Sequence, residues 1–285
     1  MKSNPPSIVR GTARSSEVRI QQRACALIIA GLDPSAGAGI AADLRMVRAT
    51  GSWGCAVLAV ITVQSTAGLV SATAVDPGLV LAQAREVLAH QRIRVIKTGA
   101  LGSSANVRAV CTLVGEHPEI PVVIDPVMIA TRSPSGARLL DPEALDAMRQ
   151  SLALATVVTP NLDEAEALLE MRITGVEGLV AAARGLVRAG ARAALVKGGH
   201  LTQGPAVDVL AIGRRVIKMI GPRLAIPPFH GGGCSLASLI AGHIASLGAK
   251  SDEDIVEAVR RARRQLRRSM RRATDIGDGL LVLPA

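Results

Sequence analysis

The chain has 285 residues, of which 49 % are hydrophobic, and it carries a formal net charge of +10. The length and the apolar fraction permit one large domain with a substantial core. The positive charge raises the question of nucleic-acid binding, but one Trp, one Phe and no Tyr provide almost no surface on which bases could stack. Nucleic acid is therefore not an expected partner.

The first segment, residues 1–22, is rich in Ser, Arg and Pro and lacks the apolar stretch of a secretory signal, so we expect a disordered lead-in. Polar residues interrupt the apolar stretches elsewhere well before the roughly 18 residues that a membrane-spanning helix needs, so no membrane contact is expected. The cysteines lie far apart, without the spacing of a zinc site or a redox pair: Cys25, Cys55, Cys111 and Cys234. This usage suits a reducing compartment, and we expect a cytoplasmic protein.

Short β-branched runs alternate with longer amphipathic segments from Ala26 onward, which is typical of βαβ units around a mostly parallel sheet. Strands are predicted over Ala26–Ala30, Ala56–Thr62, Ile93–Thr98, Pro121–Asp125, Thr156–Thr159, Ala193–Lys197, Val207–Ile212 and Arg215–Ile220. Helices are predicted over Ile40–Ala49, Pro77–His90, Ser104–Gly115, Pro142–Leu152, Asp163–Leu169, Val176–Ala189, Cys234–Leu247 and Asp252–Ala273. No repeat or linker divides residues 23–285, so we expect a single α/β domain.

The last predicted helix carries much of the excess positive charge, with eight arginines between Arg260 and Arg272. Apolar residues recur between them at helical spacing, which indicates an amphipathic helix. We interpret the basic side as a solvated face; contact with nucleic acid is the less favoured alternative.

Polar and glycine-rich segments follow most of the predicted parallel strands. The carboxyl ends of parallel strands meet at one edge of a sheet, where ligands bind in open α/β folds. These segments are Gly31–Gly39, Gln64, Lys97–Gly99, Asp125–Pro126, Thr159–Glu164 and Lys197–His200. The sequence therefore predicts a ligand site at this edge.

Two glycine clusters stand before predicted helices. The turn from Gly31 to Ile40 permits close approach of the backbone to a ligand, although such turns also occur for structural reasons alone. In the segment from His230 to Cys234, the amides of Gly231, Gly232 and Gly233 could bind a phosphoryl group at a helix N-terminus. Such a position commonly lowers a thiol pKa, so Cys234 could accept a proton; the alternative is a small buried hydrophobe.

The ordered combination of these motifs resembles the hydroxymethylpyrimidine and phosphomethylpyrimidine kinases of thiamine biosynthesis, a branch of the ribokinase-like superfamily. The similarity runs from about Ala26 to Gly279. The opening of that family, Gly-x-Asp-x-Ser-x-Gly-x-Gly-Ile-x-x-Asp-Leu, is matched by Gly31 through Leu44, and its His-Gly-Thr-Gly-Cys segment is approached by His230 through Cys234. Between them lie Gln64, Lys97-Thr98-Gly99, Asp125-Pro126-Val127-Met128, Thr159-Pro160-Asn161-Leu162-x-Glu164 and Val196-Lys197-Gly198-Gly199-His200.

The resemblance implies a three-layer αβα ribokinase-like fold and ATP-dependent phosphorylation of 4-amino-5-hydroxymethyl-2-methylpyrimidine, of its monophosphate, or of both. It implies ATP and Mg²⁺ as cofactors, a small pyrimidine as substrate and a homodimer. The implied roles are substrate binding by Gly31, Asp43 and Gln64; nucleotide binding by Asp125, Asn161 and Lys197; metal binding by Glu164; and catalysis by Cys234 with Gly231, Gly232 and Gly233.

The match is weaker on the phosphate side. Gly232 stands where the family carries threonine, which removes a hydroxyl and adds backbone freedom. Pro227 and Pro228, just upstream, remove two backbone donors. Two alternatives therefore stay open: a catalytically weak protein that senses a pyrimidine, and a kinase for pyridoxal or a related B6 vitamer.

Overall fold

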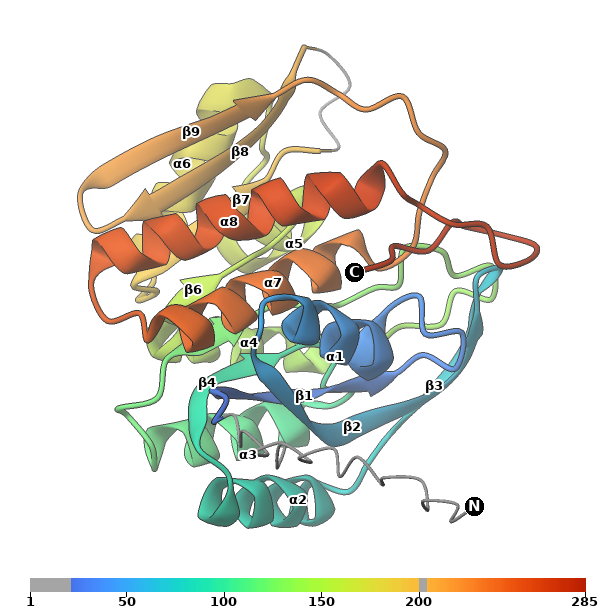
Figure 1. The fold of residues 1–285 in the computed structure, drawn as a ribbon, viewed down its shortest axis with the longest axis vertical. Coiled ribbons are helices and arrows are strands. Elements are labelled where there is room, and N and C mark those ends of the chain that lie inside the picture. Colours follow the sequence, from blue (N-terminus) through green and yellow to red (C-terminus); the bar gives the residue numbers. More distant parts are fainter. Residues whose placement is uncertain (1–21, 200–203) are drawn as a thin grey trace, which may run out of the picture.

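The computed structural model describes residues 22–199 and 204–285. Its strands are β1 (Cys25–Leu32), β2 (Trp53–Ser65), β3 (Gly68–Ala74), β4 (Ile93–Thr98), β5 (Val122–Ile124), β6 (Val157–Val158), β7 (Ala193–Lys197), β8 (Ala206–Ile212) and β9 (Arg215–Gly221). Within the described residues they form one sheet in the order β3-β2-β1-β4-β5-β6-β7-β8-β9 (Figure 1). Strands β2, β1, β4, β5, β6 and β7 are parallel, and the remaining three pair antiparallel at the two edges.

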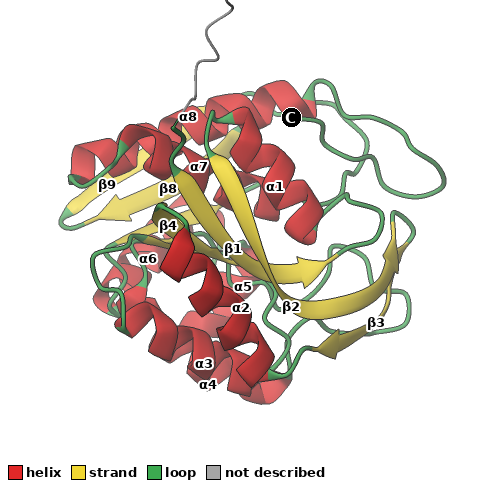
Figure 2. Ribbon diagram, turned by 60° about the horizontal axis from the view of Figure 1, so that its bottom comes forward, coloured by secondary structure: helices red, strands yellow, loops and turns green. Residues whose placement is uncertain are grey.

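Helices cover both faces of the sheet. They are α1 (Gly39–Ala49), α2 (Pro77–His90), α3 (Ser104–Gly115), α4 (Leu145–Ser151), α5 (Leu162–Leu169), α6 (Gly175–Arg188), α7 (Gly232–Leu247) and α8 (Asp252–Met270). Helices α1, α7 and α8 pack on one face, and α2 to α6 pack on the other (Figure 2). The predicted three-layer α/β fold is confirmed.

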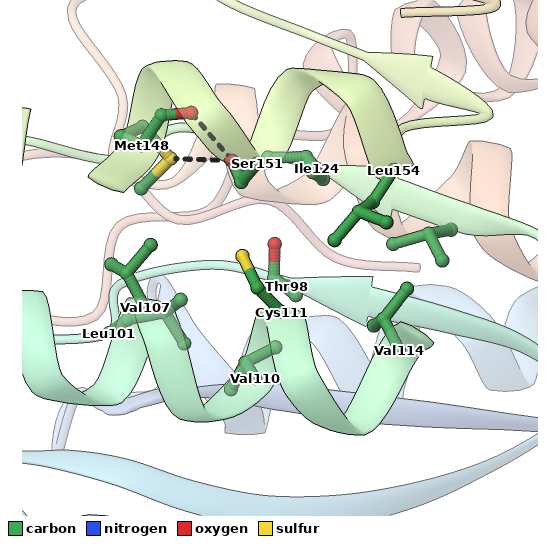
Figure 3. Close-up of a pocket in the computed structure, with 11 residues that line it drawn as sticks. Thr98, Leu101, Val107, Val110, Cys111, Val114, Ile124, Met148, Ser151 and Leu154 are labelled. Atoms are coloured by element: carbon green, nitrogen blue, oxygen red, sulfur yellow. Dashed lines mark hydrogen bonds between the residues drawn. The ribbon is translucent and has the colours of Figure 1, made fainter. Parts of the chain in front are cut away.

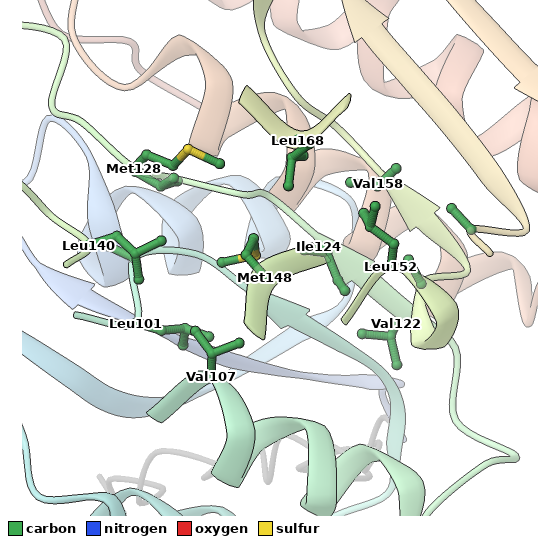
Figure 4. Packing of buried hydrophobic residues seen from close by; sticks show 14 of the residues in the cluster. Leu101, Val107, Val122, Ile124, Met128, Leu140, Met148, Leu152, Val158 and Leu168 are labelled. Atoms are coloured by element: carbon green, nitrogen blue, oxygen red, sulfur yellow. The ribbon is translucent and has the colours of Figure 1, made fainter. Parts of the chain in front are cut away.

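The central strands are apolar because both of their faces are covered by helices. In β1, the side chains from Ala26 to Ala30 are all buried, and successive residues join different clusters. Ile28 packs towards α1 and α7, whereas Ile29 packs towards α2 and α3, because side chains alternate across a strand. Figure 4 shows part of the cluster that contains Ile29, in which Val107, Ile124 and Met148 come together from α3, β5 and α4.

Local signals explain where several helices begin. The side chains of Asp76 and Ser103 accept hydrogen bonds from backbone amides in the first turns of α2 and α3. Reciprocal capping boxes begin α5, at Asn161, and α8, at Ser251. Each such cap satisfies amides that would otherwise lack a partner and typically stabilises a helix by about 1 kcal/mol.

Most predicted elements agree with the structure to within a few residues. Strand β3 was not predicted: its sequence GLVSATA is largely polar or small, and most of its side chains are exposed at the sheet edge. The predicted helix Pro142–Leu152 is a short α4 between two 3₁₀ turns, Pro142–Ala144 and Leu152–Leu154. His200 and residues 1–21 of the expected lead-in lie outside the described residues.

The basic helix α8 is not simply a solvated face. Arg263 donates hydrogen bonds to the Asp208 carboxylate at 2.7 Å and to the Met219 carbonyl at 2.8 Å, and Arg267 donates to the Pro222 carbonyl at 2.9 Å. Strand β9 is the last of the sheet, so its outer backbone groups have no neighbouring strand. These arginines therefore cover the open edge of β9 as well as facing solvent.

None of the helices in the described part of the chain combines the length and the apolar character needed to cross a membrane.

Candidate active site

The carboxyl ends of the parallel strands bring two lysines and two aspartates together. Lys97, in β4, forms an ion pair with Asp43 of α1 at 2.7 Å, and neither side chain is exposed to solvent. The second oxygen of Asp43 accepts a hydrogen bond from the Ser238 hydroxyl of α7 at 2.7 Å. Burial alone would lower the pKa of Lys97, but the carboxylate of Asp43 holds it above its ordinary value. Burial raises the pKa of Asp43, and Lys97 and Ser238 oppose that rise. The pair joins α1, β4 and α7 beneath the site.

A second cluster surrounds Asp125, which follows β5 directly. Its Oδ1 atom lies 3.3 Å from Lys197 Nζ and 3.3 Å from the Thr159 hydroxyl. Burial tends to raise the pKa of Asp125, but Lys197 and Lys97 outweigh it and hold the pKa below the ordinary value. The other oxygen, Oδ2, is buried and has no hydrogen-bond partner among the described residues. An ionised carboxylate oxygen left in this state can bind an additional donor or cation.

Glu164 lies on the other side of Lys197, at 4.0 Å between Oε2 and Nζ. The same Oε2 atom accepts a hydrogen bond from the Asn161 amide at 2.8 Å, while the Asn161 side chain accepts one from the Glu164 amide. Burial raises the pKa of Glu164 to about 7, with Lys197 opposing the rise and Asp125 adding to it. Asn161 therefore holds the helix cap that orients Glu164.

The second glycine segment forms the N-terminus of α7. Gly231 has a φ of +74°, which favours glycine, and it lies against Gly37 of the first glycine turn. Gly232 and Gly233 are already helical. A Cβ on Gly233 would come within 2.9 Å of Lys197 Nζ, so this glycine lets the lysine lie close to the helix N-terminus.

A glycine is needed at position 232 because of steric contact, and not because of an unusual backbone conformation. A Cβ at this position would overlap the ring of Phe229, the only Phe in the chain. The expected extra backbone freedom at Gly232 is not used, because the residue has entered helix α7. Phe229 and Gly232 therefore form a complementary pair in place of the threonine that the resemblance implies.

Cys234 lies in the first turn of α7, as predicted, but the expected lowering of its thiol pKa is wrong. Burial and the neighbouring Asp125 raise the pKa of Cys234, and Lys97 and Lys197 do not offset them. The ligand-free protein therefore holds a protonated thiol.

The three residues predicted to bind the substrate have different surroundings in the structure. Gln64 lies near the end of β2 with a largely buried side chain, and its amide nitrogen is 3.0 Å from His230 Nε2. Gly31 lies near the end of β1, where a Cβ would come 3.2 Å from Val60 Cβ. Asp43 is buried, with one carboxylate oxygen bonded to Lys97 and the other to Ser238, and its expected contact with a ligand stays a prediction.

A small apolar cavity lies away from these residues, between α3 and α4 (Figure 3). Its volume is about 20 Å³, and Val110, Cys111 and Met148 are among its lining residues. This is close to the space of a single water molecule. We assign it to core packing and not to ligand binding.

A family model described as phosphomethylpyrimidine kinase matches residues 33–283. The chain belongs to that family. It is 38 % identical over 222 residues to the hydroxymethylpyrimidine/phosphomethylpyrimidine kinase of Salmonella typhimurium, covering 77 % of this chain and 82 % of that protein. It is also 38 % identical over 258 residues to a thiamine biosynthesis bifunctional protein of Geobacter sulfurreducens, covering 90 % of this chain but only 51 % of the longer relative.

Solved structures agree with this assignment of the fold. The ADP complex of Bacillus subtilis pyridoxal kinase superposes with a TM-score of 0.82 at 28 % identity, covering 92 % of this chain and 97 % of that one. Phosphomethylpyrimidine kinase from Clostridium difficile superposes with a TM-score of 0.71 at 30 % identity, covering 86 % of this chain and 100 % of that one. The fold of this phosphomethylpyrimidine kinase family member is thus ribokinase-like.

The magnesium expected for such a kinase can be tested against the donors present. Residues 22–199 and 204–285 contain no group of three His, Cys, Asp or Glu side chains that could enclose a metal. The buried, unpartnered oxygen of Asp125 and the nearby Glu164 are nevertheless suitable oxygen donors. Mg²⁺ prefers oxygen ligands and keeps several waters beside nucleotide phosphates, so these two carboxylates fit it as partial ligands.

Three residues of the site received no role from the sequence alone: Asp33, Lys97 and His230. Asp33 and His230 lie in the two glycine segments, and Lys97 directly follows the buried residues Val95 and Ile96 in the central strand β4. A lysine in a central strand is a usable signal, because it must find a buried partner. The hydrogen bond between Asp33 and His230, 2.9 Å long, joins residues 197 positions apart and has no local signal.

Proposed function

We propose that this protein transfers a phosphoryl group from ATP to the hydroxymethyl group of 4-amino-5-hydroxymethyl-2-methylpyrimidine, to its monophosphate, or to both. The observation that carries the proposal is the unpartnered carboxylate oxygen of Asp125 between Lys97, Lys197 and the N-terminus of α7. This arrangement can bind a phosphate and its metal ion. The choice of substrate rests on the family and on the names of the relatives.

The residues divide into two sides. Gln64 offers a carboxamide, with a donor and an acceptor side by side, and would read the aminopyrimidine together with the backbone at Gly31. Asp43 would act from beneath, by fixing Lys97. Asn161 would hold Glu164 on the nucleotide side.

Charge on the transferring group would be stabilised by Lys197 and by backbone amides of the Gly231–Cys234 segment. Asp125 and Glu164 would hold Mg²⁺, which supplies charge neutralisation at the ATP phosphates when it is bound. The thiol of Cys234 would hold the hydroxymethyl group or a water beside it. It can become a proton acceptor only if the bound ligands change the charges around it, because burial and Asp125 raise its pKa in the free protein.

The test is ADP release by purified protein mixed with Mg·ATP and hydroxymethylpyrimidine, with pyridoxal as the competing substrate and Cys234→Ala as the control variant. We expect turnover that depends on the pyrimidine and falls in the variant. Turnover with pyridoxal alone would favour the B6-vitamer alternative, to which the superposition on the Bacillus subtilis enzyme also draws attention. Saturable pyrimidine binding without turnover would contradict the kinase proposal and favour a sensor.

We further propose a cytoplasmic homodimer, on the basis of the family resemblance and the cysteine usage. Sedimentation equilibrium of the purified protein tests the oligomeric state. A single species at the mass of one chain, 29.4 kDa, would contradict the dimer.

A further inference from the structure

We propose that His230 and Asp33 are positioning residues that decide which end of the Gln64 amide meets the pyrimidine. The inference rests on the proposed function and adds a source of substrate specificity to it. Its starting point is one nitrogen, His230 Nε2, that lies 2.9 Å from Asp33 Oδ2 and 3.0 Å from the Gln64 side-chain nitrogen. These three side chains are at most 9 % exposed.

Asp33 is held as an acceptor by its own loop. Its Oδ1 atom accepts hydrogen bonds from the Ser35 amide and the Ser35 hydroxyl, and its Oδ2 atom accepts one from the Ala38 amide. Burial works against ionisation, but the bonds from His230 and Ser35 outweigh it and hold the pKa of Asp33 below the ordinary value. Asp33 therefore faces His230 as a carboxylate with no proton to give.

It follows that His230 Nε2 carries the proton in this contact, since a bare nitrogen would face the carboxylate lone pairs at 2.9 Å. A protonated Nε2 cannot also accept a bond from the Gln64 amide nitrogen. The contact between His230 and Gln64 is satisfied when the carboxamide turns by half a rotation, so that its oxygen shares the one Nε2–H of His230 with Asp33 in a bifurcated hydrogen bond. The amide nitrogen of Gln64 then points away from His230, towards the ligand side.

The backbone leaves His230 little freedom to escape this arrangement. Its amide donates to the Leu281 carbonyl at 2.7 Å, and a Cβ on Gly37 would come within 2.6 Å of its ring. The two glycine segments are thus packed on each other around the pair, with Gly231 against Gly37. The ring is in place before any ligand binds.

In this orientation Gln64 presents a hydrogen-bond donor, so it favours a ligand that offers an acceptor over one that offers a donor. The 4-amino pyrimidine offers an unprotonated ring nitrogen, which accepts from the Gln64 amide nitrogen. The 4-oxo analogue, 5-hydroxymethyl-2-methylpyrimidin-4-one, carries a proton on that ring nitrogen. Its ring N–H would therefore face the amide N–H of Gln64, and two donors cannot form a hydrogen bond with each other. A buried mismatch of this kind corresponds to roughly a ten- to hundredfold loss of affinity.

The experiment measures the dissociation constants of the 4-amino and 4-oxo pyrimidines by calorimetry, for the wild type, His230→Ala, His230→Asn and His230→Gln. In His230→Ala and His230→Asn the Gln64 carboxamide is free to adopt either orientation. We therefore expect the preference for the amino compound to fall about tenfold or more. The longer amide of His230→Gln can still place an N–H between Asp33 and Gln64, so it should keep most of the preference. Thermal melts of all four proteins identify variants that fail to fold.

The ratio of the two constants is the decisive readout, because general damage to the site weakens both ligands alike. An unchanged ratio in His230→Ala or His230→Asn, or an equal loss in His230→Gln, would overturn the positioning role while leaving the kinase proposal intact. A wild type that binds neither pyrimidine would overturn both, and the ADP-release assay shows which substrate replaces them.

Discussion

At the scale of single residues, the site combines buried charges that are individually unfavourable and jointly compensated. Lys97 and Asp43 are withdrawn from water completely, and each is acceptable only because the other is present. The same holds for Asp125 between its two lysines. Removing one member of such a pair leaves an uncompensated charge in the interior.

We therefore expect Asp43→Asn to destabilise the protein by about 3–5 kcal/mol, measured by chemical denaturation. The double variant Asp43→Asn/Lys97→Met should lose clearly less than the sum of the single variants, because no unpaired charge is left. Additive losses would contradict an energetically coupled pair.

Phe229 and Gly232 give a second prediction at this scale. Restoring the family threonine by Gly232→Thr alone should destabilise the protein by about 1–3 kcal/mol, because its Cβ overlaps the Phe229 ring. In a Phe229→Ala background the same threonine should be tolerated better. Thermal melts of the two single variants and the double variant measure this coupling, and equal effects of Gly232→Thr in both backgrounds would contradict it.

The raised pKa of Glu164 predicts a pH dependence of stability. The pKa of this group is about 7 in the folded protein and near 4.5 in the unfolded chain, so the folded state binds more protons between these values. Its contribution is fully present below about pH 4.5 and is lost as the pH rises towards 7. The loss is on the order of 2–3 kcal/mol.

The matched variant is Glu164→Gln, which keeps an oxygen for the Asn161 amide but carries no charge. Without nucleotide or metal, the free energy of unfolding of the wild type should fall relative to this variant between pH 5 and pH 7.5. Parallel curves would show that the carboxyl group titrates normally.

At the scale of elements, α8 and β9 depend on each other. Arg263 joins the helix to Asp208 of β8 and to the Met219 carbonyl of β9, so it closes an edge that could otherwise pair with another chain. Helical periodicity predicted α8, but nothing in its pattern distinguishes the arginines that face β9 from those that face water. Their roles became visible only when β9 was placed beside the helix.

Arg263→Ala should therefore lower the stability by about 1–3 kcal/mol and promote self-association. The control is Arg268→Ala, an exposed position on the same helix, for which a change within about 0.5 kcal/mol is expected. Denaturation and light scattering measure the two effects. If Arg263→Ala and Arg268→Ala have the same stability and the same light scattering, the arginines of α8 form only a solvated basic face.

At the scale of the whole molecule, the sheet separates two hydrophobic clusters, one on each of its faces. Leu113 of α3 lies in one and Leu239 of α7 in the other. Each Leu→Ala variant should cost about 2–5 kcal/mol, and the double variant should approach the sum because the two sites share no neighbours across the sheet. A single unfolding transition in all three variants is expected of one domain; two separate transitions would contradict residues 23–285 folding as a unit.

The sequence by itself determined the α/β class, nearly every helix and strand, and the edge of the sheet at which the site lies. These features follow from hydrophobic period, caps and the alternation of strands and helices along the chain, which are encoded over neighbouring residues. Family motifs also led to Gln64, Asp125, Glu164 and Lys197, because each lies at or just beyond the end of a strand or in the first turn of a helix. The edge strand β3 was missed because its exposed, small side chains carry no strong pattern.

Only the tertiary structure decided how those residues act on each other. It placed both oxygens of Asp43 inside the protein, raised the pKa of Cys234 by burial beside Asp125, and filled the space above Gly232 with Phe229. It also brought His230 to Asp33 across 197 positions. Protonation and steric fit depend on distances between segments remote in the chain, and no local pattern records those distances.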